Sequence, residues 1–208
     1  MAIERIAFYL NRRDEVPNRE LAQELAVHAD VAGLMEVRAG LSDKNRNVRS
    51  DCLKVLYEAG YSRPDLIAGF VDDFIVLLDA KENRMQWGAM IALALISGFH
   101  PAKLFALRSK LIAKMQHGTL ITQVWGLKLF VGIIAANREC FSELRPVLKQ
   151  YIESARSLDL PGRLEHYAPI LDPVFAGELA GIIGKRTDLK TVHVKRINKV
   201  LKNHGLKI

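Results

Sequence analysis

The fold is decided by the stretch Leu41-Ser42-Asp43-Lys44-Asn45-Arg46-Asn47-Val48-Arg49 and by its looser copy, Leu78-Asp79-Ala80-Lys81-Glu82-Asn83-Arg84-Met85. The copies lie 37–38 residues apart, and other pairs recur at the same step: Gly60-Tyr61 with Gly98-Phe99, Pro64 with Pro101, and Trp87-Gly88 with Trp125-Gly126. A fixed period of this length, filled with helix-type patterns, is typical of stacked helical hairpins. Each hairpin is too small to bury its apolar face alone and does so against its neighbours.

Helical punctuation follows the same period. Pro64 and Pro101 each fit the first turn of a helix, where the missing N–H costs nothing. Residues 120–136 are apolar nearly all round, as in a helix that is buried on several sides. No strand-like alternation is present in the sequence. We therefore predict an all-α fold, a right-handed α-solenoid of stacked antiparallel helix pairs, and a single domain over residues 1–208.

The N-terminal part is less regular than the repeats. Residues 3–12 read as a short amphipathic helix. A longer helical segment starts at Asn18, a suitable N-cap, and continues to Leu41, with Gly33 as the candidate break.

The units that begin at Leu41, Leu78 and Met115 resemble HEAT and armadillo-type repeats. In such repeats a first helix ends in leucine, a short Asp/Asn turn follows, and a second helix opens with a Val-Arg-like pair. The first unit is close to this pattern, the second is looser, and the third matches only in hydrophobic spacing. The resemblance covers roughly residues 18–156 and extends to uncharacterised prokaryotic HEAT-like proteins, which imply no activity. What the superfamily implies is a curved interaction surface formed mainly by the second helices.

The composition indicates a soluble protein with a buried core, since half of the residues are apolar and a quarter are charged. No apolar run approaches the roughly 20 residues that a bilayer span needs, and the first residues lack the order of a secretory signal. Cys52 and Cys140 show no paired spacing, so we expect two buried thiols in a reduced, cytoplasmic protein.

Two Asn-Arg pairs stand at equivalent predicted helix starts and are candidate interaction residues: Asn45, Arg46, Asn83 and Arg84. One interpretation is structural, with asparagine caps and a hydrogen-bond ladder between repeats. The other is functional, with a row of donors on one edge that suits phosphate or carboxylate, because arginine offers a bidentate fork. Both interpretations require the repetition, so it does not separate them.

Trp87 and Trp125 occupy matching positions on successive second helices, with Ile91 and Leu129 one turn later. These apolar neighbours favour a core role for both indoles over ligand stacking. A HEAT-like family of DNA alkylpurine glycosylases uses tryptophans together with an acidic residue to process a damaged base. No carboxylate stands one turn after either tryptophan, which argues against that chemistry.

Nothing in the sequence supports catalysis. The six histidines show neither i,i+4 pairing nor Cys/His metal spacing, and no phosphate-binding loop or nucleophile elbow is present. We therefore predict no catalytic, cofactor-binding or metal-binding residues, and an enzyme is the third choice of function.

The C-terminal residues 185–208 hold the net charge of the chain. They contain eight basic residues and one acidic residue, a net +7 that equals the formal charge of the whole protein. Residues 189–204 read as one helix, with Ile197 and Leu201 on its apolar side. Three lysines share another side: Lys195, Lys199 and Lys202. This pattern predicts a basic amphipathic capping helix, or alternatively a patch that contacts phosphates.

The sequence therefore favours a non-enzymatic interaction or scaffold protein with a protein partner. The alternative is a nucleic-acid-binding protein, of the kind used in DNA repair, that acts through the basic C-terminal helix. Neither the partner nor the oligomeric state follows from the sequence.

Overall fold

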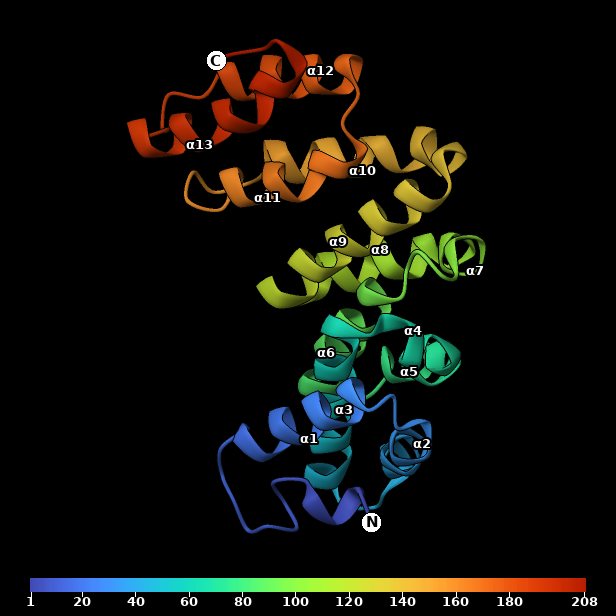
Figure 1. The fold of residues 1–208 in the computed structure, drawn as a ribbon. Coiled ribbons are helices and arrows are strands. Elements are labelled where there is room, and N and C mark those ends of the chain that lie inside the picture. Colours follow the sequence, from blue (N-terminus) through green and yellow to red (C-terminus); the bar gives the residue numbers. More distant parts are fainter. The chain divides into compact units, whose positions relative to one another are not determined.

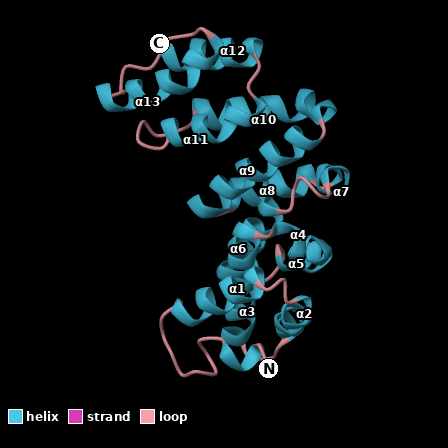
Figure 2. Cartoon of the chain, viewed as in Figure 1, coloured by secondary structure: helices cyan, strands magenta, loops and turns pink.

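The computed structural model describes residues 1–208, which form helices joined by loops, with no strand (Figure 2). The predicted all-α solenoid of stacked helix pairs is confirmed. The chain divides into two compact units, Met1–Gly132 and Ile133–Ile208, which we call unit 1 and unit 2. That all 208 residues form one domain stays a prediction. None of the helices combines the length and the apolar character that crossing a bilayer requires.

Unit 1 carries the repeats that the sequence predicts (Figure 1). Its elements are η1 (Ile3–Arg5), α1 (Val16–Val27), α2 (Val31–Ala39), η2 (Gly40–Ser42), α3 (Arg46–Ser62), α4 (Pro64–Ile67), η3 (Ala68–Phe70), α5 (Val71–Leu77), α6 (Asn83–Leu95), α7 (Pro101–Ala106), α8 (Arg108–His117) and most of α9 (Leu120–Ala136). The helices α3, α6 and α9 begin 37 residues apart, and prolines open α4 and α7. The second helices are therefore in the register that the duplicated residues predict.

The glycine that follows each tryptophan lies directly against a side chain of a neighbouring helix. The helix α3 packs against both α1 and α6. A Cβ atom at Gly88 would lie 2.6 Å from Leu53 Cδ2 of α3, and one at Gly126 would lie 2.4 Å from Met115 Cγ of α8. A larger residue at either position would force the Leu53 or Met115 side chain to move, because interiors are close-packed.

The N-terminal part differs from the prediction in two ways. Only a single 3-10 turn, η1, forms within residues 3–12, and Asn11 has a left-handed φ of 53°. The long segment breaks at Ala29, with a φ of 48°, and not at Gly33. Asp30 then caps α2 by accepting a 2.8 Å hydrogen bond from the Gly33 N–H. The break between the two helices is therefore set by the Asp30 cap and not by Gly33.

Unit 2 is helical as well, and its α-helices have 8 to 13 residues. Its further elements are η4 (Arg138–Cys140), α10 (Phe141–Glu153), α11 (Leu160–Tyr167), η5 (Ala168–Ile170), α12 (Pro173–Gly184), α13 (Thr191–Leu201) and η6 (Lys202–His204). The basic helix starts at Thr191, later than predicted, because residues 185–190 form the connection from α12. Gly205, with a φ of 70°, ends η6. Ile197 and Leu201 are buried, and α13 packs against α11.

Candidate functional site

Four aromatic side chains form a continuous group on the second helices of unit 1. We call it the aromatic row: Tyr57 and Tyr61 of α3, Trp87 of α6, and Trp125 of α9. Ring centroids are 6.3 Å apart for Tyr57 and Trp87, 6.2 Å for Tyr57 and Tyr61, and 5.7 Å for Tyr61 and Trp125. These spacings are typical of stabilising aromatic pairs. The row therefore links three helices from three successive repeats.

The row lies at the boundary between core and solvent. Tyr57 is buried, Trp87 and Trp125 are partly exposed, and Tyr61 is 48% exposed. Both tryptophans are thus mostly buried, as predicted, but neither belongs to the fully buried core. Ile91 and Leu129, one turn after each indole, do lie in the core. The indoles instead lean over the tyrosines of α3, which leaves part of each ring open to a ligand.

Two lysines flank the row. Lys128 Nζ lies 3.9 Å from the centroid of the Trp125 ring, and Lys54 Nζ lies 4.9 Å from that of Tyr57. Both distances are within the range of cation–π attraction. Burial lowers the pKa of Lys128 and raises the pKa of Tyr57 to about 12. Lys128 makes no ion pair in the structure, so its charge is available to a bound group.

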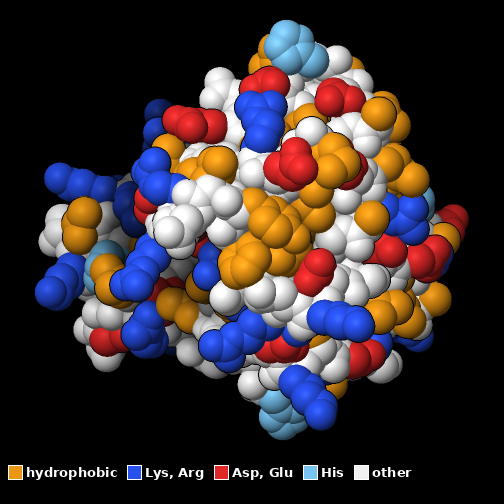
Figure 3. All heavy atoms as spheres, turned by 90° about the horizontal axis from the view of Figure 1, so that it is seen from below, with side chains coloured by type: hydrophobic (Ala, Val, Ile, Leu, Met, Phe, Trp, Pro, Cys, Tyr) orange, Lys and Arg blue, Asp and Glu red, His pale blue; other side chains and the backbone are white.

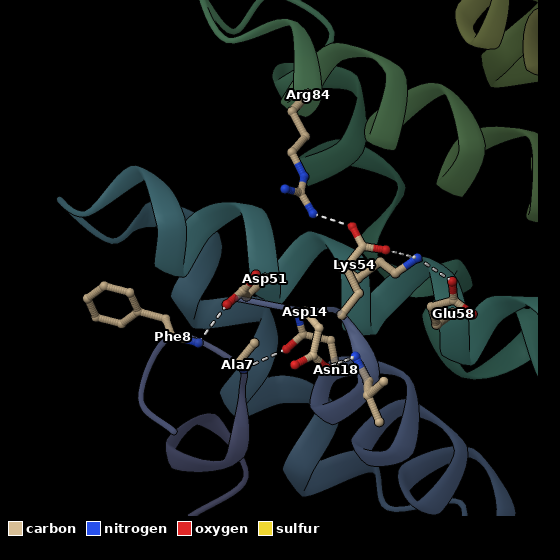
Figure 4. Close-up of polar contacts among 10 residues, drawn as sticks. Ala7, Phe8, Asp14, Asn18, Asp51, Lys54, Glu58 and Arg84 are labelled. Atoms are coloured by element: carbon tan, nitrogen blue, oxygen red, sulfur yellow. Dashed lines mark hydrogen bonds and ion pairs between the residues drawn. The ribbon is translucent and has the colours of Figure 1, made fainter. Parts of the chain in front are cut away.

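A cluster of ion pairs continues along α3 toward its N-terminal end (Figure 4). Glu15 accepts from Arg84 at 2.5 Å and from Lys54 at 3.0 Å, and Glu58 accepts from Lys54 at 2.6 Å. Burial opposes the charge on Lys54, but the bonds to Glu58 and Glu15 outweigh it and raise the pKa of that lysine. The cluster joins the N-terminal segment to α3 and α6.

The structure brings three of the four predicted Asn-Arg residues together. Arg46, Asn83 and Arg84 line one depression of about 410 Å³ at the starts of α3 and α6. Asn45 lies outside it and caps α3, accepting from the Asn47 N–H at 2.9 Å. Asn83 is not a cap, because Glu82 occupies that position with no side-chain capping bond. A regular ladder of asparagine caps is therefore absent.

The N-terminal segment covers the start of α3. The Phe8 N–H donates to Asp51 of α3 at 2.8 Å, and the Ala7 N–H donates to the buried Asn18 of α1 at 2.8 Å (Figure 4). Phe8, Tyr9 and Leu10 stay 36–50% exposed. Seen from below the view of Figure 1, hydrophobic side chains gather near the middle of the surface, with Lys and Arg among their neighbours (Figure 3).

The predicted lysines of the C-terminal helix lie in unit 2. Lys195, Lys199 and Lys202 are exposed and make no ion pair, whereas Arg196 pairs with Glu165 of α11 at 2.7 Å. The charge of α13 and η6 is thus divided between one arginine in an ion pair and three lysines that make none.

Comparison with known proteins supports the fold alone. No protein-family model matches the chain, and no curated protein matches it in sequence. Among solved structures, the chain is similar to an engineered protein, with 16% identity, a TM-score of 0.59 and coverage of 98% of both chains. It is also similar to a designed armadillo repeat protein in complex with the peptide (KR)4, with 16% identity, a TM-score of 0.64, and coverage of 89% of this chain and 86% of the other. The chain therefore has a HEAT/armadillo-like repeat fold.

Proposed function

We propose that this protein is a non-enzymatic interaction module that binds an extended peptide segment of a partner protein across α3, α6 and α9. The observation that carries the proposal is the aromatic row, which links these helices and leaves Tyr61 48% exposed. Tyrosine and tryptophan are enriched at energetic centres of interfaces, because they offer large contact areas with few rotatable bonds.

The charges beside the row suit a peptide better than a small apolar ligand. Lys128 offers a cation at one end of the row, and Glu58 offers a carboxylate near Tyr57. A backbone with mixed side chains can use both signs. The designed armadillo repeat protein with a similar fold also holds a peptide, which agrees with this choice of ligand class.

A peptide-display selection on the full chain tests the proposal, followed by affinity measurement by tryptophan fluorescence. Both tryptophans of the protein belong to the row, so a bound peptide changes the signal directly. Tyr61→Ala should weaken the selected peptides at least about tenfold, as expected for an aromatic residue at the centre of an interface.

Tyr9→Ala is the matched control, because Tyr9 is 49% exposed but lies on the N-terminal segment and outside the row. Its affinity should equal that of the wild type. Selected peptides that bind Tyr61→Ala as well as the wild type would remove the proposal.

The alternative, nucleic-acid binding through α13 and η6, rests on a separate observation: Lys195, Lys199 and Lys202 are exposed and make no ion pair. Each engaged phosphate steepens the salt dependence of duplex DNA binding by about 0.9 in log K against log salt. The triple variant Lys195, Lys199, Lys202→Gln should then bind duplex DNA more weakly, and its affinity should depend less on salt. Equal binding by this variant and the wild type would leave α13 as a cap.

A further inference from the structure

Four arginines gather where the N-terminal segment meets the starts of α3 and α6. The depression of about 410 Å³ is lined by Arg46 and Arg84 among others. A second depression, of about 240 Å³, is lined by Arg12, Arg13 and the same Arg84. Asn47 and Ser50 line both depressions, so the two adjoin and form one basic recess.

The acidic residues of the recess are already engaged. Glu82 accepts from Arg49, and its pKa is lowered by its own backbone N–H and by that arginine. Asp51 accepts from the Phe8 N–H at 2.8 Å. Arg49 thus neutralises Glu82 from outside the recess, whereas Asp51 keeps its charge, and the four arginines outnumber the two carboxylates that line the recess.

The arginines themselves fall into two groups. Arg84 is held by Glu15 at 2.5 Å, and Arg12 is held by Asp14 at 2.8 Å. Arg13 and Arg46 are exposed and make no ion pair or hydrogen bond. Two positioned guanidinium groups and two free ones therefore surround the same space.

Amide donors complete the recess, beside a covered hydroxyl. Ser50 Oγ lies out of reach of solvent and has no hydrogen-bond partner, although Ser50 lines both depressions. Asn47 and Asn83 also line the larger one. An anion in this space would meet arginine forks and amides, a donor set that binds phosphoryl oxygens with directional hydrogen bonds, whereas the Ser50 hydroxyl is covered.

We propose that this basic recess binds the phosphoryl group of a phosphorylated serine or threonine in the peptide that occupies the aromatic row; this inference rests on the proposed function. The ion cluster of Glu15, Lys54 and Glu58 connects the recess to the row along α3. A phosphoryl group carries about −1.5 to −2 charges at neutral pH and three acceptor oxygens. That charge matches two unpaired arginines better than a single carboxylate does.

A localised dianion fits the recess better than a nucleic acid. The recess is bordered by Asp14 and Glu15, which hold its positioned arginines, and Glu58 lies further along α3. A polyanion that followed this face would meet those carboxylates. Unit 1 has seventeen basic and fifteen acidic residues, so its overall field gives little attraction to an extended polyanion.

The test compares two degenerate peptide libraries on the full chain at about physiological ionic strength, where weak surface attraction is screened. One library carries a fixed phosphoserine or phosphothreonine, and the other has the unmodified residue. The wild type should bind the phosphorylated library at least about tenfold more tightly, as expected for charge-assisted contacts. Arg46→Gln and Arg13→Gln should each remove most of this preference.

Arg19→Gln is the matched control, because Arg19 is exposed and unpaired but does not line the recess. It should keep the full preference. Since Arg13 and Arg46 make no ion pair or hydrogen bond, thermal melting should show that all three variants fold as the wild type does.

Three outcomes overturn the inference: no preference for the phosphorylated library, an unchanged preference in Arg46→Gln and Arg13→Gln, or equal loss in Arg19→Gln. Equal competition by duplex DNA would also overturn it, since that marks a general cationic surface. The proposed function is read separately with Tyr61→Ala, which should weaken both libraries alike. Loss of affinity in Tyr61→Ala without any arginine effect keeps the peptide site and removes the phosphoryl site.

Discussion

Unit 1 and unit 2 bury their interiors in different ways. In unit 1 the 17-residue helix α3 buries nine of its residues. In unit 2 the 11-residue helix α13 buries three. The charges differ as well, with seventeen basic and fifteen acidic residues in unit 1 against thirteen and eight in unit 2.

In unit 2, arginine side chains donate hydrogen bonds to backbone carbonyls of other elements. Arg138 donates to the Ile170 carbonyl at 2.6 Å and Arg186 to the Ala155 carbonyl at 2.6 Å, while the buried Arg163 donates to the Tyr151 carbonyl. These bonds satisfy carbonyls at or near helix ends, which otherwise lack partners. Arginines also act in unit 1, where Arg49 donates to the Asp43 carbonyl at 2.8 Å. The difference therefore lies in the core: the long helix α3 buries most of its apolar side chains, whereas the short α13 buries few.

The largest effect is expected in the core of unit 1. Phe74→Ala removes a fully buried ring from α5, which packs on α6, and should lower the free energy of unfolding by about 3–5 kcal/mol. Chemical denaturation followed by tryptophan fluorescence reports this unit alone, because both tryptophans lie in it.

Val76→Ala is the control on the same helix, since Val76 is 70% exposed. It should change the free energy of unfolding by less than about 0.5 kcal/mol. Similar costs for the two variants would contradict an apolar core at α5 and α6.

A polar truncation should matter in unit 2. Arg163→Met leaves the Tyr151 carbonyl without its donor and should cost about 1–3 kcal/mol of folding free energy, the range for an unsatisfied buried group. Arg156→Met is the control, because the Arg156 side chain is 68% exposed. Circular dichroism during denaturation measures both. If the two variants are equally stable, the hydrogen bond from Arg163 to the Tyr151 carbonyl does not stabilise unit 2.

Much of the repeat architecture could be predicted from local signals. The effect of a first-turn proline or an N-cap is confined to its own helix start. The positions of Pro64, Pro101 and Asn45 therefore predicted where α4, α7 and α3 begin. The break at Ala29 was missed, because Asp30 caps α2 while Gly33 merely donates the N–H. Two candidate signals, the glycine and the Asp30 cap, stood close together, and the sequence alone does not show which of them ends the helix.

The candidate site was harder to predict, since it depends on distant residues. Arg84 and Glu15 are 69 positions apart, and nothing in their local sequence indicates the ion pair. Tyr57 and Tyr61 carry no motif, although their i,i+4 spacing on a helix could have suggested a shared face. For the tryptophans, the apolar neighbours Ile91 and Leu129 correctly indicated a mostly buried position, but not that part of each indole reaches the surface.

The smallest expected effect is the change in stability with pH that comes from two carboxylates, one in each unit. The pKa of Asp79 in unit 1 is lowered by Lys110 and then Lys114, and that of Glu178 in unit 2 by Arg145, with a smaller contribution from Lys149. Because both folded-state pKa values are depressed, their stabilisation is present above the unfolded pKa of about 4. It is lost as the pH falls through the folded values.

Asp79→Asn and Glu178→Gln should therefore lower stability at pH 7 and flatten its decline toward pH 3. Both effects should be small, because both pairs are solvent-screened. Denaturation curves at several pH values measure them. An unchanged pH profile in both variants would remove these ion pairs as contributors to stability.

The central claim is that the aromatic row is the peptide-binding surface, and the two indole N–H signals test it most directly. In a ¹H–¹⁵N spectrum of the full chain, Trp87 and Trp125 give the only indole resonances, and both lie in the row. We predict that a selected peptide shifts both signals, together with backbone amides of α3, α6 and α9, and leaves those of α13 in place. Saturable peptide binding that leaves both indole signals unmoved would contradict the account.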